Sequence, residues 1–69
     1  MQVSFSNVLK QERLATGLSQ EKFAEKVGLS MHSISLLETG KQQPTLPTLN
    51  RIAKALDIKT SELLKLIEK

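Results

Sequence analysis

One stretch of the sequence, residues 18–40, constrains the fold more than any other. It reads LSQEKFAEKVGLSMHSISLLETG and carries apolar residues at helical spacing on both sides of Gly28. This pattern predicts two short helices, residues 20–27 and 31–38, that bury against each other around a tight turn. Gly28 allows a positive φ in that turn, and Ser19 and Ser30 are suited to cap the two helices. The apolar positions that bring the helices together are Ala24, Val27, Leu29, Ile34 and Leu37.

The segment before this stretch predicts another helix. The run FSNVLKQERLAT, residues 5–16, can begin after Ser4 or Ser6, and Gly17 can end it in the left-handed conformation. Arg13 lies at the edge of its apolar stripe. The stripe itself consists of Phe5, Val8, Leu9 and Glu12.

Two helices are predicted after the stretch. Thr45 can cap the first of them, and Pro47 is tolerated there because first-turn amides have no intrahelical partner. The second begins at Thr60 or Ser61. The apolar face of the first consists of Leu46, Leu49, Ile52, Ala53 and Leu56. The apolar face of the second consists of Leu63, Leu64 and Ile67, with Leu66 apart from it.

The fold class follows from this series of helices. No segment shows the strict alternation of apolar and polar residues that is typical of a strand. A chain of 69 residues forms one small domain at most. We therefore predict the all-α class, with a compact five-helix domain that takes up the whole chain, residues 1–69.

The composition narrows the kind of protein. The sequence has no cysteine and one histidine, so disulfides are excluded and a structural zinc site is not expected. Ten Lys and Arg against seven Asp and Glu give a net charge of +3, which suits a polyanionic partner. The start MQVSFSNVLKQER has no signal-peptide run, and no stretch has the ~18 apolar residues of a membrane span. We expect a soluble, cytoplasmic protein that does not interact with membranes.

Catalysis is not expected. The single histidine, His32, and the single aspartate, Asp57, fall on different predicted elements, and the sequence assembles no nucleophile with a base and an orienting group. Each glycine is separated from the next by the length of a short helix plus a turn, and no Gly-rich phosphate loop is present. We predict that the protein is not an enzyme and uses no cofactor, metal ion or small-molecule ligand.

Several short motifs, in this order and spacing, carry a family resemblance. They are GLSQ at 17–20, AEKVG at 24–28, ISLLE at 34–38, GK at 40–41, Pro44, and LNRIAKAL at 49–56. Together they closely resemble the helix-turn-helix domain of the phage lambda repressor and Cro type, also called the XRE family. The resemblance covers roughly residues 9–64. It implies a compact five-helix, lambda-repressor-like fold, with the motif at about residues 19–38, that binds double-stranded operator DNA, usually as a dimer.

The resemblance also implies which side chains read the bases. The second helix of such a motif enters the major groove, and the positions that match its reading face are Met31, His32 and Leu36. Met31 and Leu36 can read only shape and thymine methyl groups, whereas His32 can donate to guanine N7 or O6, or to a phosphate. The other interpretation is that Met31 and Leu36 are semi-buried packing residues or a patch that binds a protein.

Further contacts are expected with the DNA backbone. The amino end of the helix at 20–27 offers free backbone amides and a favourable dipole to a phosphate. The loop after residue 38 offers amide, hydroxyl and ammonium groups to a second phosphate cluster. The predicted phosphate-contacting residues are Gln20, Ser30, Thr39, Lys41, Gln42 and Gln43.

Two structural roles complete the interpretation. The resemblance implies an ion pair between Arg13 and Glu38 that orients the reading helix rather than adding net stability. The last helix offers apolar surface to a second copy of the chain through Leu63, Leu66 and Ile67, unless the core consumes these side chains. Five further lysines are expected to be solvated, and they are Lys22, Lys26, Lys54, Lys65 and Lys69.

Three functions remain open at this point. We favour a sequence-specific DNA-binding transcriptional regulator, a repressor that acts as a homodimer on a palindromic operator. The alternative is a protein-interaction module on the same fold, in which Met31 and Leu36 receive a partner, as in an antitoxin or a target of an anti-repressor. A small enzyme is the third, and it lacks a site.

Overall fold

The computed structural model describes residues 4–67, which form five α-helices. They are α1 (Phe5–Thr16), α2 (Gln20–Val27), α3 (Met31–Glu38), α4 (Leu46–Ala55) and α5 (Thr60–Ile67). No strand occurs within residues 4–67. The predicted all-α, five-helix fold is therefore confirmed. Lys69, which was expected to be solvated, lies outside the described residues.

Local capping defines where the first four helices begin. In each case a hydroxyl oxygen just before the helix accepts a hydrogen bond from a first-turn amide, which would otherwise lack a partner. For α1 the cap is Ser4, which accepts from the N–H of Asn7, so Ser4 and not Ser6 takes this role. The caps of the next three helices are Ser19, Ser30 and Thr45.

A residue with a positive φ lies at the end of each of the first four helices or in the turn that follows it, and after α3 this residue is Gly40, with φ 78°. Gly17 ends α1 with φ 78°, and Gly28 ends α2 with φ 88°. After α4 the corresponding residue is Asp57, with φ 61°, the one residue other than glycine with a positive φ in the described part of the chain. Its N–H donates to the carbonyl of Lys54, and the N–H of Ile58 donates to that of Ala53. These bonds close α4 and turn the chain into α5.

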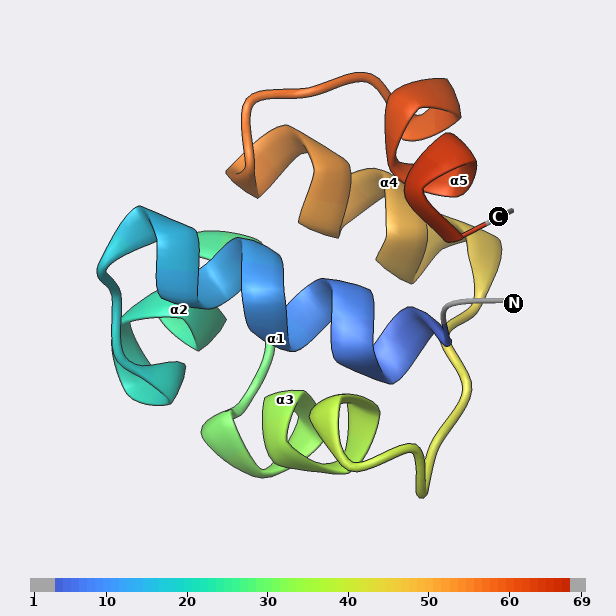
Figure 1. Cartoon of the computed structure of the whole chain (residues 1–69). Helices are drawn as coiled ribbons and strands as arrows, with labels where there is room; N and C mark the ends of the chain where they lie inside the picture. Colours follow the sequence, from blue (N-terminus) through green and yellow to red (C-terminus); the bar gives the residue numbers. More distant parts are fainter. Residues whose placement is uncertain (1–3, 68–69) are drawn as a thin grey trace.

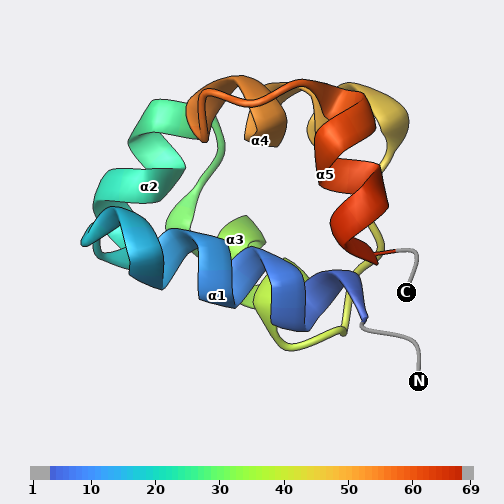
Figure 2. The same cartoon turned by 45° about the horizontal axis from the view of Figure 1, so that its top comes forward.

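The helices enclose one hydrophobic core. Figures 1 and 2 show α1 running along α3, while α4 and α5 lie at the far side of the molecule from α3. α2 connects the two halves, because it packs against both α3 and α4. The largest fully buried side chains are Phe23, Leu9, Ile34, Leu37, Ile52 and Leu63.

Several apolar residues differ from the sequence-based expectation. Leu46 was predicted on the buried face of α4 but is 62% exposed, because it is the first residue of that helix and lies beyond the core. Leu64 was predicted on the buried face of α5 but is 37% exposed. Ala55 and Phe23 are buried, although neither was assigned to a buried stripe. Phe23 extends from α2 into the centre, where α2 meets its neighbours.

Phe23→Ala is predicted to abolish the folded state at 25 °C. Truncating a fully buried Phe costs ~3–5 kcal/mol, and a domain of this length has a total stability of a similar size. Circular dichroism at 222 nm should show the loss of helix. The control, Leu14→Ala, removes a side chain that is 52% exposed and should keep the native spectrum and melting temperature. A native spectrum and an unchanged melting temperature for Phe23→Ala would contradict the proposed core.

Candidate nucleic-acid interface

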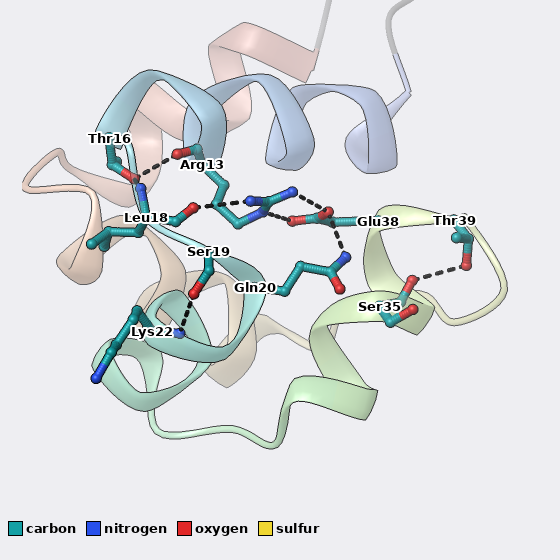
Figure 3. A network of polar contacts seen from close by, with 9 residues as sticks. All are labelled: Arg13, Thr16, Leu18, Ser19, Gln20, Lys22, Ser35, Glu38 and Thr39. Atoms are coloured by element: carbon teal, nitrogen blue, oxygen red, sulfur yellow. Dashed lines mark hydrogen bonds and ion pairs between the residues drawn. The ribbon is translucent and has the colours of Figure 1, made fainter.

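A buried ion pair links α1 to the end of α3. The Nε of Arg13 donates to the Oε2 of Glu38 at 2.6 Å, and Nη2 donates to Oε1 at 3.2 Å. The two side chains are only 10% and 3% exposed. The remaining Nη1 of Arg13 donates to the carbonyl of Leu18 at 2.9 Å. The structure thus brings together the two residues expected to pair, and the same guanidinium also fixes the chain between α1 and α2 (Figure 3).

Gln20 belongs to the same network. Its Nε2 donates to the Oε1 of Glu38 at 3.0 Å, so the carboxylate accepts three hydrogen bonds from two elements (Figure 3). Sequence reasoning placed Gln20 against a phosphate and did not find this bond, since nothing in helical spacing reports a contact between residues 18 positions apart. As a first-turn residue of α2, Gln20 still presents its backbone N–H at the end of that helix.

The network leaves one side of α3 facing solvent. Ile34 and Leu37 are buried against the rest of the domain, and Glu38 is held in the network. On the other side, Met31 is 52% exposed, His32 is exposed, and Leu36 is partly buried. The three residues expected to read bases therefore share the accessible side of α3. Because residues four apart are neighbours on a helix, His32 and Leu36 lie side by side.

The loop after α3 is more constrained than the sequence suggested. The hydroxyl of Thr39 donates to the carbonyl of Ser35 at 2.9 Å (Figure 3), and the backbone N–H groups of Lys41 and Gln42 donate to the carbonyl of Leu36 at 3.0 and 3.2 Å. These two backbone N–H groups therefore already have an acceptor within the chain. They fold back because the last carbonyls of a helix need donors.

What this loop leaves accessible is its side chains. Lys41, Gln42 and Gln43 are exposed, and Lys41 carries the one positive charge among the predicted phosphate contacts. Ser30 is exposed too, but its hydroxyl accepts from the N–H of Ser33 at 3.1 Å and donates to the hydroxyl of Ser33 at 3.0 Å. Ser30 thus acts first as a helix cap.

Within residues 4–67, no three His, Asp or Glu side chains gather where they could hold a metal ion. None of the helices in the described part is long and apolar enough to span a membrane. The candidate interface consists of α3, the amino end of α2 and the loop that follows α3.

In class, α2, the turn at Gly28 and α3 form a helix-turn-helix unit that is supported by three further helices. A family model described as helix-turn-helix matches residues 9–63. Among curated proteins, the control protein C.MunI from a Mycoplasma species is 40% identical over 70 aligned residues, which cover 100% of this chain and 95% of that protein.

Solved structures give the same assignment. The restriction-modification controller protein C.AhdI from Aeromonas hydrophila matches with a TM-score of 0.81 and 37% identity over 86% of this chain and 89% of its own. SinR, a master regulator for biofilm formation solved in complex with DNA, matches with a TM-score of 0.79 and 30% identity over 87% of this chain and 97% of its own. The chain belongs to the helix-turn-helix family, as its sequence motifs predict.

The Arg13–Glu38 pair generates a stability prediction. Arg13→Met leaves a buried carboxylate without its cation and should cost ~3–5 kcal/mol in the free energy of unfolding. The double variant Arg13→Met/Glu38→Leu removes both charges, so it should recover most of that loss, because an apolar pair of similar volume is often neutral. Urea unfolding followed by circular dichroism measures both. A double variant no more stable than Arg13→Met would show that the unpaired charge is not the cause.

Proposed function

We propose that this chain, as one helix-turn-helix domain over residues 1–69, is a sequence-specific DNA-binding transcriptional regulator that represses transcription from a palindromic operator. The observation that carries the proposal is the geometry of α3, which is locked on one side by the Glu38 network and accessible on the other. A rigid helix with one accessible side suits insertion into the major groove. The DNA-bound state of SinR supports this role.

Base reading in this proposal depends largely on apolar contact. Met31 and Leu36 present no hydrogen-bonding group, so they recognise the C5 methyl groups of thymine and the shape of the groove. His32 supplies a hydrogen bond to guanine or to a phosphate. In this proposal Lys41, Gln42 and Gln43 contact the DNA phosphates through their exposed side chains, and Gln20 does so through its first-turn amide. The hydroxyls of Ser30 and Thr39, which were expected to do the same, already donate hydrogen bonds within the chain.

Thymine methyl groups should therefore contribute to affinity. After a site has been selected from random duplexes, replacing each thymine by deoxyuridine should weaken binding by about fourfold where a methyl group is contacted, since burying one such group is worth ~0.8 kcal/mol. Fluorescence anisotropy measures the loss. At one or more of these positions, the replacement should no longer weaken binding by Met31→Ala. Binding by His32→Ala should still be weakened at every position where the unaltered protein is affected. Selection of no duplex would instead favour the protein-interaction module.

Lys41 should strengthen the contact with the DNA phosphate backbone without affecting sequence preference. Lys41→Gln is expected to lower affinity equally for all duplexes, and to make the slope of log K against log salt shallower by about 0.9 per subunit. Lys65→Gln removes the same charge from α5 and serves as the matched control, with no change in slope. An equal change in both variants would show that only net charge matters.

We also propose that the protein acts as a homodimer through α5. Leu63 is excluded from this surface because it is completely buried, and Ile67 packs against the core. Leu66 is 37% exposed on the same helix and supplies the apolar contact. A palindromic operator requires two copies related by a two-fold axis.

The dimer is tested by sedimentation equilibrium. Leu66→Glu should raise the dissociation constant of the dimer by at least about tenfold, because a desolvated charge replaces an apolar contact. Leu14→Glu, at a 52% exposed position on α1, should leave self-association unchanged. A monomer mass at all concentrations for the unaltered protein, with and without its operator, would refute the proposal.

A further inference from the structure

The carboxyl ends of α2 and α4 form a groove that the proposed DNA contact does not use. Figure 2 shows these ends, green for α2 and dark orange for α4, side by side and away from α3. Along α2, the groove lies about 9 Å beyond Gln20, since a helix rises 1.5 Å per residue. The residues that line the groove, here called the α2–α4 groove, are Lys26, Val27, Arg51, Lys54 and Ala55.

Three of the five lining residues are cations, and none is an acid. Lys26, Arg51 and Lys54 are all exposed. Within residues 4–67 the one ion pair joins Arg13 to Glu38, so none of these three cations forms a salt bridge with a carboxylate of the described chain. The guanidinium of Arg51 reaches across to the end of α2. Its Nη1 would lie 3.9 Å from a Cβ added at Gly28.

Helix dipoles explain part of this arrangement. Lys26 lies in the last turn of α2 and Lys54 in the last turn of α4, where the negative end of each dipole favours a cation. Each end is satisfied by one cation, and Arg51 adds a third that lies before the last turn of α4. Three like charges facing one groove repel one another unless an anion joins them. The arrangement therefore suits an anionic occupant.

We propose that the α2–α4 groove binds an acidic segment of a protein partner while α3 remains free to hold DNA. A carboxylate can accept two parallel hydrogen bonds from Arg51, with Lys26 and Lys54 on either side as point charges. Val27 and Ala55, each 5% exposed, give the groove an apolar floor on which an aliphatic part of the segment can rest. A recess between two helix ends admits a peptide more readily than a broad DNA duplex.

The test maps binding on the ¹⁵N-labelled protein by NMR, with hexaglutamate as the probe at low salt. Amide shifts should concentrate on residues 26–28 and 51–55 and spare α3. Arg51→Gln should lower the affinity for hexaglutamate by roughly threefold to fivefold, as expected for the loss of one exposed charge pair. Lys22→Gln removes the same charge from an exposed site on α2 outside the groove and should have little effect. Unchanged melting temperatures confirm that both variants are folded.

Three outcomes overturn the proposal. Equal weakening by Arg51→Gln and Lys22→Gln, or shifts spread over all lysines, would show that the probe responds only to net charge. A short mixed-sequence duplex is titrated in parallel. If Arg51→Gln weakens binding of the duplex as much as binding of hexaglutamate, the groove belongs to the DNA-binding surface. The proposal that it binds an acidic protein segment is then rejected.

Discussion

The carboxylate of Glu38 accepts two hydrogen bonds from Arg13 and one from Gln20 in an environment that is almost closed to water. A buried charge of this kind is costly unless all its partners are in place. The last turn of α3, the first turn of α2 and the last turn of α1 must therefore meet in one arrangement. The placement of α3 depends on this constraint, because the bonds of Glu38 tie that helix to α1 and α2.

The sequence predicted the helices well because their boundaries are local. A serine or threonine before each of the first four helices and the glycines after α1 and α2 act over a few residues, and spacing alone reveals them. Burial is different, since it depends on which neighbour covers a position. Leu46 has the right spacing for the core and still lies outside it. Phe23 is completely buried, although the apolar spacing did not assign it to the core.

The candidate site shows the same division. That Met31, His32 and Leu36 lie on the accessible side of α3 could be inferred from helical periodicity. The bond from Gln20 to Glu38 and the folding back of the amides of Lys41 and Gln42 could not, because these donors choose among acceptors that only the folded chain brings near. Nor did the spacing of Lys26, Arg51 and Lys54 indicate that they meet in one groove.

Asp57 has a consequence that reaches beyond its own turn. A residue with a Cβ in the left-handed region is held there against a steric cost, and here that conformation redirects the chain between α4 and α5. The direction of α5 decides where Leu66 lies, and a pair of such helices would decide how far apart two copies of α3 stand. In the proposed homodimer, the turn at Asp57 would therefore contribute to the distance between the two operator half-sites that the two copies of α3 contact.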